Sequence, residues 1–186
     1  MQADQKKMPL VAAMLKYKKE QVYPFHTPGH KGGRGMEPLL AGELGAGALQ
    51  MDVSLMAELD DIHCPEGCIA AAQTLAAQLY GSDRCFFAVN GTTQAIQAML
   101  MTAVKPGGKV LIPRNAHRSV AGGLLLGDLE PVYVLPQFDA VFGINTQVTA
   151  GQIEEALQKD PSIKAVFLTS PNYYLSLIHI SEPTRP

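Results

Sequence analysis

The chain has 186 residues, of which 47% are hydrophobic and 17% charged, and its formal net charge at neutral pH is −2. This hydrophobic fraction is enough to bury a core, and a weakly acidic chain lacks the basic surface that binds nucleic acid or an anionic membrane. No apolar run approaches the roughly 18 residues of a membrane-spanning helix. We therefore expect a globular, cytoplasmic protein with neither nucleic-acid nor membrane partners.

The N-terminal region combines a helix with a glycine-rich loop. Residues 9–20 carry apolar side chains at helical spacing, which predicts an amphipathic helix. Residues 23–35 contain two prolines and four glycines, a composition typical of a loop. The loop also carries His26, His30 and Lys31, which we interpret as candidate substrate-binding or active-site residues. The two histidines have the spacing of a helical metal pair, but the intervening Pro-Gly excludes a helix, so we predict no metal site.

Alternating helices and strands follow along the rest of the chain. Helical spacing over residues 66–80 ends at Gly81, a residue typical of a helix C-cap. An apolar run at 84–89 predicts a strand, and a helix over 94–104 follows it. Further strands are expected at 110–113, 131–135 and 165–169, with further helices at 119–126 and 149–158. Thr149 and Gln152 have the spacing of a capping box at the start of the last helix.

Nearly continuously apolar strands that alternate with helices predict an α/β fold, in which a mainly parallel sheet has helices on both faces. Ligands of such sheets bind beyond the carboxyl ends of the strands. The loops after Val89, Pro113 and Thr169 are therefore where we expect the functional site.

The first of these loops, Asn90-Gly-Thr-Thr93, leads into a helix. Backbone N–H groups at a helix N-terminus and two hydroxyls make a cup for phosphate. The same residues also suit an ordinary helix cap. The loop has neither the Gly-Lys-Ser/Thr of a Walker motif nor the GxGxxG of a dinucleotide site, so a small phosphate ester suits it better than a nucleotide.

The second loop contains His117, which follows a predicted strand and precedes a predicted helix. A histidine there can stack on a ligand ring or act as an acid or base, although a lone histidine is more often simply half-buried and hydrogen-bonded. The three cysteines, Cys64, Cys68 and Cys85, are odd in number and have no second Cys/His pair at metal-ligand spacing. We expect them to be free thiols.

Five motifs, in this order, resemble the major domain of the Orn/Lys/Arg decarboxylase family. The resemblance covers residues 5–174. The chain resembles in particular the short members of the family, which have no receiver-like N-terminal domain. Its carriers are Pro24-Phe-His-Thr-Pro-Gly-His-Lys-Gly-Gly33, Glu58-Leu-Asp-Asp-Ile-His-Cys-Pro-Glu-Gly67, Phe86-Phe-Ala-Val-Asn-Gly-Thr-Thr93, Pro113-Arg-Asn-Ala-His-Arg-Ser119 and Thr169-Ser-Pro-Asn-Tyr-Tyr174.

This resemblance implies part of an aminotransferase-like large domain of fold type I and the cofactor pyridoxal 5′-phosphate. It implies that Gly91, Thr92 and Thr93 cradle the cofactor phosphate and that His117 stacks on the pyridine ring. It further implies a decarboxylase of lysine, arginine or ornithine, active as a homodimer or larger assembly. Another fold-type-I enzyme, an aminotransferase or aldolase, is the alternative, as is a non-catalytic remnant.

The resemblance also implies two residues that the chain does not show in a matching motif. These are the Schiff-base lysine and the aspartate that pairs with the pyridine nitrogen, and both are expected downstream. Lys31 does not match the motif of the Schiff-base lysine. Residues 175–185 read as the in-frame translation of a sequencing-library adapter. We therefore divide the chain into an N-terminal helix and loop (1–35), the N-terminal part of the cofactor-binding domain (36–174) and a non-native tail (175–186), and expect the chain itself to be inactive.

Overall fold

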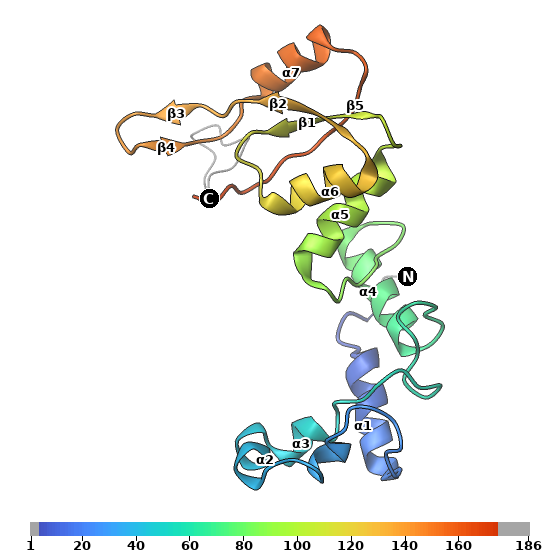
Figure 1. Cartoon of the computed structure of the whole chain (residues 1–186). Coiled ribbons are helices and arrows are strands. Elements are labelled where there is room, and N and C mark those ends of the chain that lie inside the picture. Colours follow the sequence, from blue (N-terminus) through green and yellow to red (C-terminus); the bar gives the residue numbers. More distant parts are fainter. Residues whose placement is uncertain (1–3, 175–186) are drawn as a thin grey trace. The chain divides into compact units, whose positions relative to one another are not determined.

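The computed structural model describes residues 4–174, so the predicted tail at 175–186 lies outside the described residues. The chain divides into two compact units, Met1–Phe87 and Ala88–Pro186. The first unit is helical and the second combines a parallel sheet with helices (Figure 1). Each unit is described by itself below.

The first unit begins with helix α1, Pro9–Glu20, which confirms the predicted helix. Pro9 stands at the first helical position, where its missing N–H group costs no hydrogen bond. The helix ends at Gln21, whose left-handed backbone (φ 48°) stops the helical pattern. Lys18 and Lys19 occupy the last turn, where positive charge complements the helix dipole.

The predicted loop is present, and it contains one short 3-10 turn, η1 (Lys31–Gly33). Two short helices follow, α2 (Pro38–Leu44) and α3 (Ala46–Leu49), neither of which the sequence predicted. A close contact fixes η1 against α3, because a Cβ added to Gly33 would lie 2.9 Å from the Leu49 side chain. A side chain here would displace the end of Leu49, and the positive φ of 94° also favours glycine.

Helix α4, Cys68–Tyr80, confirms the predicted helix, and Gly81 ends it in the left-handed conformation that was expected. Its N-terminus is capped from a distance by Asp60. This carboxylate accepts hydrogen bonds from the backbone N–H groups of Asp61, Glu66, Gly67, Ile69 and Ala70, at 2.8–3.3 Å. These bonds, the one from Glu66 first, hold the pKa of Asp60 well below its usual range.

Replacing Asp60 by asparagine is expected to lower the urea midpoint of the first unit, because an amide has one acceptor oxygen and no charge to offer these N–H groups. The lowered pKa means that the cap is complete above the ordinary carboxyl value of 3.8 and is lost as pH falls through the folded value. The difference between wild type and variant should therefore shrink below pH 3.8. Asp83→Asn, at an exposed residue of the same unit, is the control and should leave the midpoint unchanged.

Over its described residues, 88–174, the second unit is built on a three-stranded parallel sheet in the order β2-β1-β5. The central strand β1, Lys109–Pro113, pairs along its whole length with β2, Glu130–Val134, and on its other side with β5, Ile163–Val166. The predicted strands at 110–113 and 131–135 are thus confirmed to within a residue. The strand predicted at 165–169 begins and ends earlier, although Phe167 N–H still donates to the Leu111 carbonyl.

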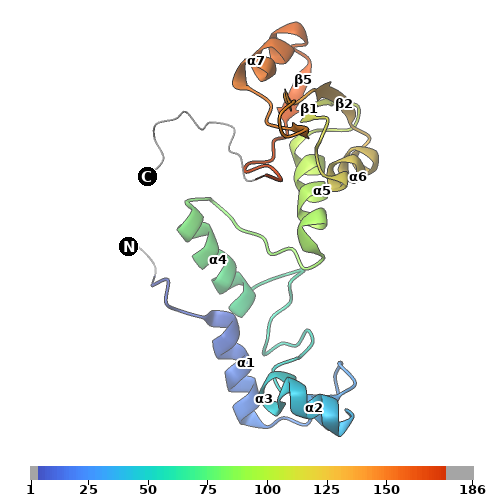
Figure 2. The same ribbon diagram turned by 90° about the vertical axis from the view of Figure 1, so that its left-hand side faces the viewer.

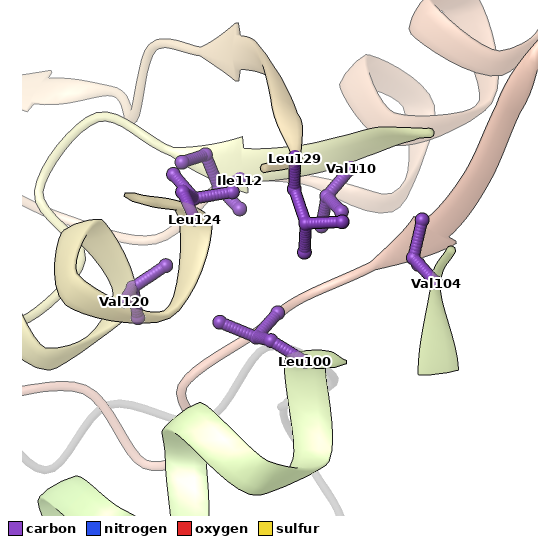
Figure 3. Packing of buried hydrophobic residues seen from close by; sticks show 7 residues of the cluster. All are labelled: Leu100, Val104, Val110, Ile112, Val120, Leu124 and Leu129. Atoms are coloured by element: carbon purple, nitrogen blue, oxygen red, sulfur yellow. The ribbon is translucent and has the colours of Figure 1, made fainter. Parts of the chain in front are cut away.

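Helices cover both faces of this sheet (Figure 2). Helices α5 (Gly91–Ala103) and α6 (Arg118–Gly127) lie on one face, where they pack on each other and on the sheet. The buried side chains of this layer are Leu100, Val104, Val110, Ile112, Val120, Leu124 and Leu129 (Figure 3). Helix α7, Ala150–Lys159, covers the opposite face, where Leu111 packs with Val134 and Val148. The predicted α/β fold with a parallel sheet and helices on both faces is confirmed.

Two local features hold the elements of this unit in register. Thr149 caps α7, and its capping box with Gln152 is formed as the sequence predicted. Lys109, at the start of β1, donates to the Asp160 carboxylate at 2.8 Å and lies 4.0 Å from Glu130. The hydrogen bond from Lys109 lowers the pKa of Asp160 to about 2 and raises the pKa of the lysine.

The prediction of a strand at 84–89 was wrong, because these residues form no strand in the described structure. Their apolar side chains are exposed, with Phe86 76% and Val89 68% accessible. An apolar run becomes a strand only when a neighbouring strand accepts its backbone hydrogen bonds, and the described part of the sheet offers this segment no such pairing. The sequence also missed a hairpin of two very short strands, β3 (Phe138–Asp139) and β4 (Ile144–Asn145).

Candidate functional site

The carboxyl ends of β1 and β5 border a cavity of about 340 Å³ in the second unit. The chain after β1 contributes Asn115, Ala116 and His117, and the chain after β5 contributes residues from Leu168 to Tyr174. A third wall comes from the last residue of β4, Asn145, and from Gln147 and Val148 between β4 and α7. Two of the three loops at which the sequence placed the functional site therefore meet here, as expected for a parallel sheet.

The polar lining of this cavity consists mainly of amide and hydroxyl side chains. Its described lining residues include four amide side chains, two phenols and one imidazole, but no aspartate, glutamate, lysine or arginine. The nearby Arg114 makes a cation–π contact with Tyr133 on β2, with its guanidinium carbon 5.1 Å from the ring centroid. Flat polar groups of this kind suit a neutral or weakly charged planar ligand.

His117 is held at this edge by the start of α6, for which it is the N-cap residue. Its Nδ1 accepts a hydrogen bond from the backbone N–H of Ser119 at 3.2 Å. The Ser119 hydroxyl lies 2.8 Å from the same nitrogen and is buried, with 3% of the residue exposed. Both contacts between the imidazole ring and Ser119 are therefore made through Nδ1.

The predicted phosphate ligands lie at the start of α5. Gly91, Thr92 and Thr93 form its first turn, and all three are exposed. Asn90, the N-cap residue, gives this end no side-chain hydrogen bond, and its own backbone N–H donates to Oε1 of Gln94 at 3.0 Å. Among the described residues, the N–H groups of 91–93 and the two threonine hydroxyls have no hydrogen-bond partner.

The structure does not bring all the predicted cofactor ligands into one cavity. His117 lines the cavity at the strand ends, but Gly91, Thr92 and Thr93 do not. The segment that should anchor the start of α5 to the sheet is 84–89, which lies outside the sheet for the reason given above. The predicted phosphate ligands and His117 therefore lie at two separate places within the second unit.

The predicted loop residues of the first unit have a cavity of their own, of about 510 Å³. His26 and Lys31 line it together with Tyr17, Lys18 and Arg34. Tyr17 hydroxyl and His26 Nε2 are 2.8 Å apart, and the Lys31 ammonium donates to the His26 carbonyl. These contacts tie the loop to α1 and fix the lysine at the cavity wall.

His30 is not among the residues that line this cavity, although Asp52, to which it is hydrogen-bonded, is. Its Nδ1 accepts from Gly33 N–H, and its Nε2 donates to the carboxylate of Asp52 at 3.1 Å. Asp52 was not predicted, because it lies 22 residues along the chain and belongs to no recognisable motif. This pairing gives His30 a structural role in holding η1.

The three cysteines are free thiols, as predicted. Cys68 is half-buried and donates to the Leu59 carbonyl, and burial raises the pKa of its thiol. No three His, Cys, Asp or Glu side chains gather at metal-binding distance within residues 4–174. In the same range, none of the helices has the length and apolar character needed to cross a lipid bilayer.

Comparison with known proteins decides the family. The family model described as "Orn/Lys/Arg decarboxylase, major domain" matches residues 8–182. The chain belongs to this family. Among curated relatives, it is 38% identical over 170 residues to an arginine decarboxylase of Halalkalibacterium halodurans, a match that covers 91% of this chain and 35% of the relative. It is 30% identical to the inducible lysine decarboxylase of Escherichia coli, with 80% of this chain and 21% of that relative covered.

Solved structures agree with this family assignment. The constitutive lysine decarboxylase of Escherichia coli matches with a TM-score of 0.72 at 30% identity, over 90% of this chain and 25% of that one. A lysine decarboxylase of Francisella novicida matches with a TM-score of 0.74 at 25% identity, over 89% of this chain and 25% of that one. The chain thus spans about a third of the length of the arginine decarboxylases and about a quarter of these lysine decarboxylases.

Proposed function

We propose that this family member is part of a pyridoxal-phosphate-dependent decarboxylase that converts lysine, arginine or ornithine into the corresponding amine and carbon dioxide. The observation that carries the proposal is the open first turn of α5, whose N–H groups and hydroxyls have no partner among the described residues. The family relationship supports it, because the relatives named above are called arginine and lysine decarboxylases.

The first turn of α5 fits a phosphate group. Three backbone N–H groups and two hydroxyls are available there, and the positive end of the helix dipole favours an anion. Gly91 has a positive φ of 75°, and a Cβ at this position would meet nothing within 4 Å. Space for a ligand is therefore present beside the donors. Thr92 and Thr93 would each add a charge-assisted hydrogen bond.

The cavity at the strand ends fits the ring of the same cofactor. Its amide and hydroxyl side chains and the imidazole of His117 suit a planar heterocycle. Pyridoxal phosphate, when bound, supplies an electron sink for the carbon from which carbon dioxide leaves. The protein's share would be to bind the phosphate at the first turn of α5 and to orient the ring against His117.

Recognition of a basic substrate requires a negative charge for its distal cation. No carboxylate lines the cavity among the described residues. We infer that this charge comes from outside the described part of the chain, which is consistent with a shared site in a homodimer or larger assembly. We place the enzyme in the cytoplasm.

The direct test is release of carbon dioxide from lysine, arginine and ornithine by the longest protein that carries this sequence, with pyridoxal phosphate added. We expect one of the three to be decarboxylated, and a Thr92→Ala/Thr93→Ala variant to need more cofactor for the same rate. The 186-residue chain alone should give no amine, because it has no lysine in the expected motif. Transamination without carbon dioxide release would contradict the proposal and favour an aminotransferase.

A further inference from the structure

We propose that Ser119 is the positioning residue of the candidate site: its hydroxyl and its backbone N–H both contact Nδ1 of His117 and so fix the orientation of the ring. This inference depends on the proposed function only for the identity of the ligand, pyridoxal phosphate, on which the ring stacks. The geometry itself is a property of the start of α6, where His117 is the N-cap and Ser119 is the second helical residue.

Two donors converge on one nitrogen of the imidazole. The backbone N–H of Ser119 points at Nδ1 from 3.2 Å, and a backbone amide can only donate. Nδ1 is therefore an acceptor, so a neutral ring carries its proton on Nε2. The Ser119 hydroxyl, 2.8 Å from Nδ1, then also donates, and this shorter contact is the stronger of the two.

The burial of Ser119 shows that the hydroxyl is aimed at the ring and not at solvent. Ser119 is the buried polar residue of the core, with 3% of its surface exposed, while His117 beside it is exposed. Its neighbour Val120 belongs to the apolar cluster under α6. A buried hydroxyl without a partner destabilises a fold, and the only partner of this one among the described residues is His117.

A ring fixed in this way suits the proposed stacking partner. The face of a neutral imidazole is electron-rich and attracts a ring that carries positive charge, whereas an imidazolium would repel it. With Nδ1 occupied by two donors, the imidazole has one free polar atom, Nε2–H. Ser119 thus sets both the plane of the ring and the tautomer of its neutral form.

The first measurement needs no cofactor. In ¹⁵N- and ¹³C-labelled chain, the ring-nitrogen shifts of His117 report the hydrogen bond at Nδ1, and ring-carbon relaxation reports the mobility of the ring. In Ser119→Ala, we expect the Nδ1 signal to move towards that of a free imidazole and the ring to become more mobile. Ser119→Thr, which retains the hydroxyl, should restore both. An unchanged Nδ1 signal and an equally rigid ring in Ser119→Ala would overturn the proposal.

The second measurement separates positioning from a general effect on the fold. Ser119→Ala should weaken affinity for pyridoxal phosphate by roughly threefold to tenfold, the value of one neutral hydrogen bond. In a His117→Asn background, which retains a helix-capping side chain but lacks the ring, Ser119→Ala should have no further effect. An equal loss in both backgrounds would show that Ser119 acts on the helix and not through His117.

The two measurements also separate this inference from the proposed function. If no form of the chain binds pyridoxal phosphate, the cofactor proposal fails while the ring signals still decide the role of Ser119. If the chain binds the cofactor but the ring is unaffected by Ser119→Ala, the positioning role fails and the proposed function stands.

Discussion

Replacing Thr92 or Thr93 by alanine is expected to weaken the binding of pyridoxal phosphate by roughly ten- to a hundredfold per residue, the value of a hydrogen bond to a charged group. Each hydroxyl belongs to the first turn of α5, where the structure gives it no protein partner among the described residues. A hydroxyl beside the N–H groups of a helix N-terminus is placed to donate to a bound phosphate.

A matched control for this prediction lies on the same helix. Thr102 donates its hydroxyl to the Ala98 carbonyl, near the other end of α5, so Thr102→Ala should leave cofactor affinity unchanged. Fluorescence or absorbance titration of each variant with pyridoxal phosphate measures the effect. If Thr92→Ala and Thr93→Ala both bind as tightly as wild type, the start of α5 is only a helix terminus.

Replacing Leu111 by alanine is expected to destabilise the second unit by about 2–5 kcal/mol, the usual cost of removing a large buried aliphatic side chain. Leu111 is fully buried in the central strand and packs under α7 with Val134 and Val148. The cavity left behind cannot collapse easily, because β1 is hydrogen-bonded to a strand on each side.

The control for this second prediction is Leu125→Ala, since Leu125 on α6 is 84% exposed and should change stability by less than about 0.5 kcal/mol. Urea unfolding is best followed by NMR signals from β1, because they report the second unit alone. Equal midpoints for the two variants would contradict the assignment of Leu111 to the core.

The sequence predicted those elements whose signals are local. Helix α1 has its apolar spacing, α4 has its terminal glycine, and α7 has both members of its capping box in the sequence itself. Helices α2 and α3 are too short for a periodic pattern to show. The strand prediction at 84–89 was wrong for the opposite reason. The local apolar pattern is strong, but a strand also needs a neighbouring strand, which no local pattern specifies.

The same distinction applies to the candidate site. His117 and the phosphate cup were predicted because they follow apolar runs in recognisable motifs. Ser119 belongs to one of these motifs, but its role depends on where its hydroxyl points, which the sequence does not encode by spacing alone. Asn145 and Gln147 reach the cavity through a hairpin that the sequence missed, so no pattern marked them.

The central claim is that the start of α5 binds the phosphate of the cofactor. Titration of ¹⁵N-labelled chain with pyridoxine 5′-phosphate tests it most directly, because this analogue has no aldehyde and cannot react with lysines. We predict that the amide signals of Gly91, Thr92 and Thr93 move with the phosphate ester and not with pyridoxine, which lacks the phosphate. Signals of these three amides that stay in place at saturating ester, or move equally with pyridoxine, would contradict the claim.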